Sequence, residues 1–122
     1  MFGLFERPKL EARFTPAQAL TDEFARTLVL AGHLTIANSG ADAEVVDVEM
    51  MVIAGSRRIP LEVPPEWRAL RVARGAAHEG SVQWTQALEA PLRAETGELA
   101  VTARDQKHKK WEWRLPFGFE RR

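Results

Sequence analysis

Apolar and polar side chains alternate along residues 27–37 and again along residues 44–54. A period of two residues is typical of a β-strand with one buried face. The second stretch also carries apolar residues on its other face, which indicates partial cover on both sides. Residues 38–40 read Asn-Ser-Gly, and Asn and Gly tolerate the positive φ angles of tight turns. We therefore expect the two strands to form a hairpin.

Four later stretches show the same alternation: residues 59–63, 81–86, 99–103 and 111–117. Pro60 lies in the first of them and has no amide donor, so we expect that strand at a sheet edge. Turn-forming residues separate the stretches, and long helices that could connect parallel strands are missing. This spacing is typical of a β-sandwich or barrel.

Two segments depart from the strand pattern. Residues 15–26 begin with Thr15 and Pro16, and Gln18 follows three residues after the threonine. This is the pattern of a helix N-terminus, so we expect a short helix there, with an irregular connection as the alternative. Residues 66–74 suit an extended or loop segment with one helical turn.

The patterns together predict an all-β fold, an Ig-like or half-arrestin-like β-sandwich of about seven strands with at most one or two short helices. The length suits a single domain over residues 1–122, which can fold without a disulfide or a metal. The expected core consists of inward-facing strand residues. They are Leu28, Leu30, Leu34, Ile36, Val46, Val48, Met50, Val52, Val82, Trp84, Leu99, Val101, Trp111, Trp113 and Leu115.

Charge and cysteine content exclude several classes of protein. Seventeen Lys and Arg residues balance seventeen Asp and Glu residues, which argues against a dedicated nucleic-acid-binding protein. The chain has no cysteine, which excludes a disulfide framework, thiolate zinc sites and a cysteine nucleophile, and fits a cytoplasmic location. No stretch approaches the length of a membrane span.

No motif carries recognisable catalytic chemistry. The three histidines lie far apart in the sequence, and no serine occupies a nucleophile motif. Asp47 and Glu49 share a strand face and could act as an acid–base pair or bind calcium. Solvated carboxylates that protect a strand from aggregation are the simpler interpretation. We therefore expect a non-enzymatic protein with no catalytic residue, no metal and no cofactor.

Two features could bind a ligand. Trp67 follows two prolines outside any clear strand, so its indole could contact a partner or sugar, or could close one end of the sandwich. Lys107, Lys109 and Lys110 form a basic patch at a hairpin tip next to Trp111, which suits anionic groups. A polar turn before a buried strand is the alternative explanation of the lysines.

The stretch from Leu30 to Gly55 and the segment Ile59-Pro60-Leu61-Glu62-Val63-Pro64 resemble bacterial sporulation-control proteins of arrestin-like fold. Those proteins have a glycine before a strand, a small turn, and then an acidic and apolar strand. They usually carry two sandwiches, and the Pro-Gly pair that commonly opens their strand is Ala31-Gly32 here. The resemblance implies one sandwich that acts as a regulatory or scaffolding partner, and it carries over no catalytic residue.

We therefore expect an interaction module that binds a protein partner or a second copy of itself. The edge strand around Ile59 or the segment 119–122 could supply the surface. The alternative is a carbohydrate- or anionic-polymer-binding module built on Trp67 and the lysines. The apolar run Met1–Phe5 is expected to pack on the domain as a strand or to form an apolar tail.

Overall fold

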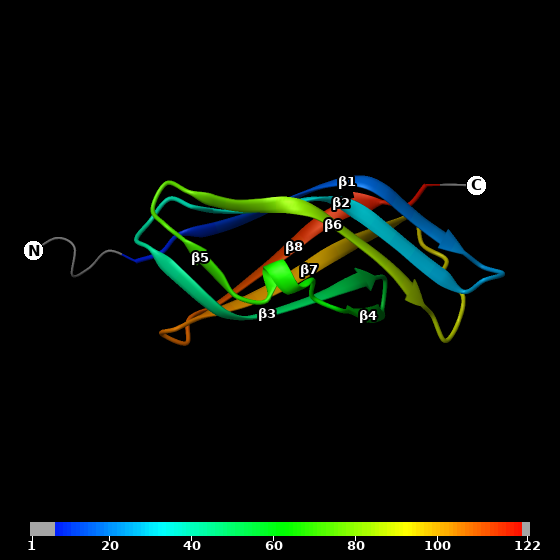
Figure 1. Cartoon of the computed structure of the whole chain (residues 1–122). Helices are drawn as coiled ribbons and strands as arrows, with labels where there is room; N and C mark the ends of the chain where they lie inside the picture. Colours follow the sequence, from blue (N-terminus) through cyan, green and yellow to red (C-terminus); the bar gives the residue numbers. More distant parts are fainter. Residues whose placement is uncertain (1–6, 121–122) are drawn as a thin grey trace, which may run out of the picture.

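Alternating stretches become strands throughout the chain, and a further strand forms where we predict a helix (Figure 1). The computed structural model describes residues 7–120, so Met1–Phe5 and Arg121–Arg122 lie outside the described residues. The all-β prediction is confirmed. The described elements are β1 (Leu10–Asp22), β2 (Thr27–Asn38), β3 (Ala43–Ala54), β4 (Arg57–Leu61), the 3₁₀ turn η2 (Pro65–Trp67), β5 (Leu70–Val72), β6 (Ala77–Ala87), β7 (Thr96–Asp105) and β8 (Lys110–Gly118).

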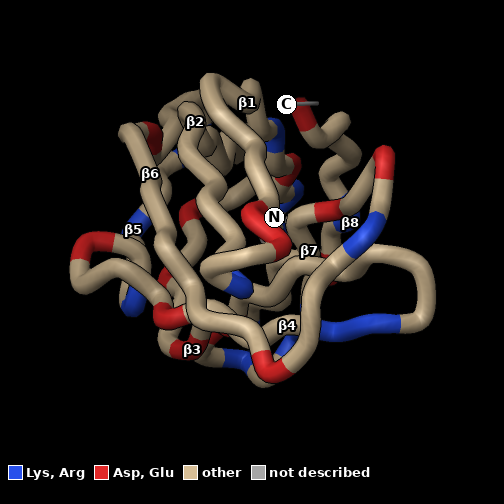
Figure 2. The backbone as a smooth tube through the Cα atoms, turned by 90° about the vertical axis from the view of Figure 1, so that its right-hand side faces the viewer, with Lys and Arg blue, Asp and Glu red and all other residues tan. Residues whose placement is uncertain are grey.

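The strands form two antiparallel sheets that pack face to face (Figures 1 and 2). One sheet has the order β1-β2-β6, and the other has the order β4-β3-β7-β8, with β5 pairing with the first part of β3. Figure 2 shows that charged residues are unevenly distributed, since β2 carries none and β6 carries only Glu79. Two antiparallel sheets in two layers are the arrangement of a β-sandwich.

The core lies between the sheets and is built from the alternating apolar positions. Inward-facing residues of β2, β3, β6 and β7 meet there, and most of the expected core is buried as predicted. Burying each large aliphatic side chain contributes about 1.5–3 kcal/mol. The fully buried members include Leu28, Leu30, Leu34, Ile36, Val52, Leu99 and Val101.

The predicted hairpin between residues 27–37 and 44–54 is wrong. β2 ends at Asn38 in the three-stranded sheet, and β3 begins at Ala43 in the other sheet. The turn residues 38–40 therefore start a crossover between layers. Local turn chemistry is compatible with both outcomes, and the pairing of β2 with β1 and β6 decides between them.

Asn38 holds this crossover in place. Its side chain is buried, and Oδ1 accepts hydrogen bonds from the amides of Lys9 (3.1 Å) and Gly40 (2.9 Å). Nδ2 donates to the carbonyls of Ala41 (2.7 Å) and Val72 (2.8 Å). One side chain thus joins the segment before β1, the crossover and the end of β5.

The predicted helix within residues 15–26 is also wrong. Residues 10–22 form β1, and residues 23–26 form the turn to β2. Pro16 is tolerated because β1 is an edge strand and its register shifts between Pro16 and Gln18. Pairing with β2 along the whole strand outweighs the local preference for a helix start. Phe24, at the turn, is fully exposed.

Irregular pairing changes the inward-facing residue in β3. A register shift between Val45 and Asp47 buries Val45 and leaves Val46 52% exposed. The prediction that Val46 belongs to the core is therefore wrong. A β-bulge inserts one residue, so strict alternation fails across it.

Three residues of the expected core are less buried than predicted because they lie on an edge strand. Trp111, Trp113 and Leu115 point inward but are only half-buried, because β8 is the last strand of its sheet.

Trp67, in contrast, is fully buried. The strand that contains Pro60 is β4, which lies at a sheet edge as predicted.

Gly32 provides a direct test of how β1 packs on β2. We expect Gly32→Ala to lower the free energy of unfolding by about 1–3 kcal/mol, because overpacking strains a close contact. A Cβ at this position would collide with the backbone oxygen of Thr15 and lie 2.6 Å from the ring of Phe14. Gly80→Ala, on the neighbouring strand β6, is the matched control, since its Cβ would meet nothing within 4 Å. Chemical denaturation measures both variants, and equal stabilities would contradict the packing.

Candidate functional site

The acidic pair Asp47 and Glu49 lies on the exposed outer face of β3. Asp47 lies opposite Arg104 of β7 in the strand register, and the Asp47 and Glu49 carboxylates line a hollow together with Arg58 and Glu112. This mixed set of charges is typical of a solvated sheet face. Within residues 7–120, no group of three or more metal-ligating side chains comes together. The expectation of a non-enzymatic protein stays a prediction.

Trp67 belongs to the interior. Its side chain is 0% exposed, its ring meets that of His78 edge to face at 4.5 Å, and its Nε1 has no hydrogen-bond partner. The interpretation of Trp67 as an exposed contact is wrong, because the turn η2 directs the indole inward towards β6. The alternative interpretation, in which the indole closes one end of the sandwich, is compatible with this burial and stays a prediction.

The basic patch lies where we predict it, at the tip between β7 and β8. Lys107, Lys109 and Lys110 are exposed, and Lys109 Nζ lies 4.8 Å from the ring centre of Trp111. The buried carboxylate of Asp105 shapes the tip, since its Oδ1 accepts hydrogen bonds from the amides of Lys107 (2.9 Å) and Lys109 (2.8 Å). Anion binding by the three lysines stays a prediction.

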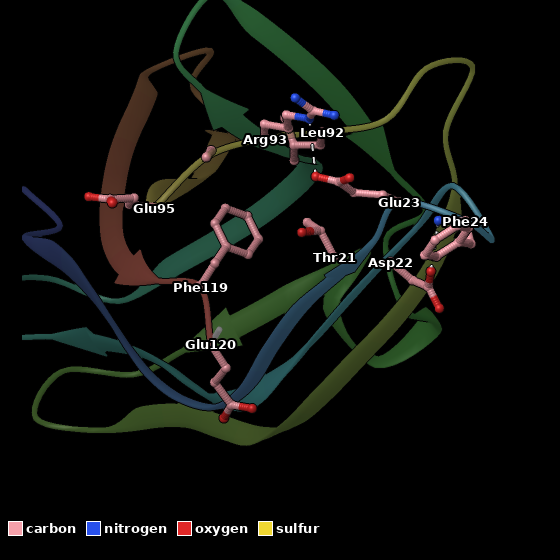
Figure 3. Close-up of a pocket in the computed structure, with 10 residues that line it drawn as sticks. Thr21, Asp22, Glu23, Phe24, Leu92, Arg93, Glu95, Phe119 and Glu120 are labelled. Carbon is pink, nitrogen blue, oxygen red and sulfur yellow. Dashed lines mark hydrogen bonds and ion pairs between the residues drawn. The ribbon is translucent and has the colours of Figure 1, made fainter. Parts of the chain in front are cut away.

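A pocket of about 580 Å³ opens at the opposite end, between the β1–β2 turn, the loop before β7 and the chain after β8 (Figure 3). Its lining includes four acidic residues, but the Oδ1 atom of one of them, Asp22, accepts hydrogen bonds from the amides of Phe24 and Ala25. Glu23 pairs with Arg93 at 3.1 Å, as Figure 3 shows. These two carboxylates stabilise the local turn and loop, so the pocket does not by itself indicate a ligand.

The β7–β8 ladder shows which backbone groups of β8 are free. Hydrogen-bonded and non-bonded pairs alternate along an antiparallel ladder. Near one end the Asp105 amide donates to the Lys109 carbonyl (3.0 Å), and at the other the Phe119 amide donates to the Glu95 carbonyl (2.8 Å). The register between these ends has no shift. The odd-numbered residues of β8 therefore bond to β7, and the even-numbered residues face outward.

The outward-facing amides of β8 belong to Lys110, Glu112 and Arg114. Pro116 also faces outward and offers only a carbonyl, which is the usual placement of proline on an edge strand. Within residues 7–120, no strand pairs with this side of β8. The edge thus presents a regular row of donors and acceptors.

Half-buried apolar side chains follow the same strand. Trp111, Trp113 and Leu115 point towards the core, yet solvent reaches them. β1 of the opposite sheet approaches β8 near Phe117, whose ring lies 6.3 Å from that of Phe14, and the two strands diverge towards the start of β8 (Figure 1). Trp111 and Trp113 belong to the first part of β8, before Phe117. We call the outward backbone groups and these three side chains the β8 edge.

The other sheet edges differ from that of β8 in length, regularity or the side chains beside them. β4 spans five residues, and Pro60 removes one donor. β1 contains a bulge, and its Ala19 carbonyl accepts a hydrogen bond from the Glu120 amide (2.8 Å). At β6, the aromatic side chain Trp84 is buried, and its Nε1 donates to the carbonyl of Glu62 (2.7 Å). β8 therefore combines a regular free edge with half-buried indoles, and β1 contacts it near Phe117.

Comparison with known proteins adds information on the fold. No protein-family model matches the chain, and no curated protein resembles it significantly. The sporulation control protein Spo0M of Bacillus subtilis matches 94% of this chain with a TM-score of 0.59 and 10% identity. The chain has an arrestin-like fold. The resemblance seen in the sequence is thereby confirmed.

The match with this chain covers 50% of the length of Spo0M. A Bordetella pertussis protein named ApaA matches 94% of this chain and 97% of its own length, with a TM-score of 0.61 and 16% identity. At such identities the likeness concerns the fold alone.

Sequence reasoning missed the β8 edge. The alternation in residues 111–117 correctly placed the indoles on the inner face, but it could not show that this strand is the last in its sheet. Pro116 was the available signal, because proline inside an alternating stretch indicates an edge strand.

Proposed function

We propose that this chain is a non-enzymatic interaction module that binds an extended segment of a protein partner along the β8 edge. The observation that carries the proposal is the row of outward-facing amides at Lys110, Glu112 and Arg114 beside half-buried indoles. In strand addition, backbone hydrogen bonds provide affinity, and neighbouring side chains provide specificity. The β8 edge offers both.

A single substitution can separate backbone pairing from side-chain contact. Glu112→Pro removes an outward donor and leaves the β7 ladder intact, because the Glu112 amide faces away from β7. We expect this variant to bind extended peptides, selected on the wild-type chain from a phage-displayed library, at least about tenfold more weakly, since it blocks main-chain pairing. Isothermal titration calorimetry measures the affinity.

Two control variants accompany this test. Glu112→Gln keeps the amide and should retain most of the affinity, and Lys107→Ala changes the basic patch without touching the edge. Peptides that bind Glu112→Pro as tightly as the wild-type chain would contradict the proposal, and so would failure to select any peptide.

The alternative function narrows to an anionic-polymer-binding module. Trp67 is buried, so this alternative now depends on Lys107, Lys109 and Lys110. Peptide binding that is lost in Lys107→Ala and kept in Glu112→Pro would favour it.

The location of the protein is a separate question. Residues 7–120 include no helix of the length and hydropathy that a membrane crossing requires. The cytoplasmic location expected from the composition stays a prediction.

A further inference from the structure

We propose that the β8 edge pairs with β8 of a second copy of this chain, in antiparallel register about a two-fold axis at Trp113. This inference rests on the proposed function, because it names the strand that the edge receives. It follows from the alternation of charge along β8 and from the position of its free backbone groups.

The charges on the outer face of β8 select the register. Lys110, Glu112 and Arg114 alternate in sign along this face. An antiparallel two-fold pairing that keeps inner faces together must centre on a single residue. Centring on Glu112 or Arg114 places like charges directly opposite each other, which is unfavourable across strands. Centring on Trp113 places Glu112 of each copy opposite Arg114 of the other.

A centre at Trp111 would also pair opposite charges, Lys110 with Glu112. That register overlaps β8 with β8 only from Lys110 to Glu112, because β8 begins at Lys110. The Trp113 register overlaps the strands from Lys110 to Pro116. It therefore combines complementary charge with the longer ladder.

The free backbone groups fit the same register. Glu112 and Arg114 face outward, so each can exchange both main-chain hydrogen bonds with its opposite residue in the second copy. Lys110 lies opposite Pro116, where its amide donates to the Pro116 carbonyl. The missing amide of Pro116 thus removes bonds only at the two ends of the ladder.

Pairing of the two strands covers the half-buried indoles on their inner faces. Trp113 of the two copies form a non-hydrogen-bonded pair, the position in which facing side chains approach most closely. Trp111 lies opposite Leu115 of the second copy, and aromatic pairs of this kind stabilise neighbouring strands. The three apolar side chains that solvent reaches in one chain are then covered by their counterparts.

Charge reversal tests the register with the full chain. We expect the wild-type chain to dimerise in sedimentation-velocity experiments. Glu112→Arg places two arginines opposite each other at both symmetric positions, so its dimer should dissociate at least about tenfold more readily. Arg114→Glu should act in the same way, with a minor additional effect because Arg114 also lies 3.9 Å from Glu98. Circular dichroism checks that the variants fold.

Variants that restore opposite charges across the two strands provide the decisive test. The double variant Glu112→Arg/Arg114→Glu restores opposite charges and should dimerise like the wild-type chain, and a mixture of the two single variants should form heterodimers. Glu49→Arg is the matched control, since it reverses an exposed charge on the same sheet face but on a central strand. Its dimerisation should be unchanged.

Three results would overturn the inference. A dimer that tolerates both single reversals uses another surface. A chain that stays monomeric but binds peptides sensitive to Glu112→Pro overturns self-pairing and leaves the proposed function standing. A chain that neither dimerises nor binds such peptides overturns both.

Discussion

Trp67→Ala is expected to lower the free energy of unfolding by about 3–5 kcal/mol, the usual cost of removing a fully buried tryptophan. The indole is 0% exposed and packs edge to face on His78, so its loss leaves a cavity between η2 and β6. Guanidinium denaturation followed by circular dichroism measures the change, because three other tryptophans complicate a fluorescence signal.

Two further variants test the assignment of Trp67 to the core. Trp113→Ala should cost about half as much, because Trp113 is half-buried on an edge strand and a smaller cavity results. Trp67→Phe should also cost less than Trp67→Ala, since it keeps an aromatic ring and removes the unpartnered Nε1. A larger loss at Trp113 than at Trp67 would contradict the burial of these two residues.

Asn38→Leu is expected to lower the free energy of unfolding by about 3 kcal/mol or more, although leucine is more hydrophobic. The substitution leaves the amide of Gly40 and the carbonyls of Ala41 and Val72 without their partner, and each unpaired buried group costs about 1–3 kcal/mol. Thermal and chemical denaturation measure the loss.

Ser39→Ala is the matched control for Asn38→Leu, because Ser39 lies in the same crossover and is exposed. Its stability should change by less than about 0.5 kcal/mol. Hydrogen exchange adds a local readout, since the Gly40 amide should lose its protection in Asn38→Leu. An Asn38→Leu variant as stable as the wild-type chain would show that the crossover does not depend on this side chain.

The candidate site shows where prediction from the sequence stops. The basic tip at Lys107–Lys110 was predicted correctly, because a polar run between two alternating stretches is a local signal. Trp67 was ambiguous, because η2 is too short to have a periodicity that indicates its buried side. The β8 edge could not be derived from alternation, since a two-residue period is the same in a central strand and in an edge strand.

The sequence by itself determined the all-β class, most of the strands and most of the core, because the two-residue period of a strand is a local property of the chain. It did not determine that residues 10–22 form a strand, that Asn38 starts a change of sheet, or that Val45 replaces Val46 in the core. Each of these depends on hydrogen bonds with residues distant in the sequence, including those of β2, Val72 and β7. Only the tertiary structure decided them, because pairing between distant strands outweighs local preference and also determines which strand is left with an open edge.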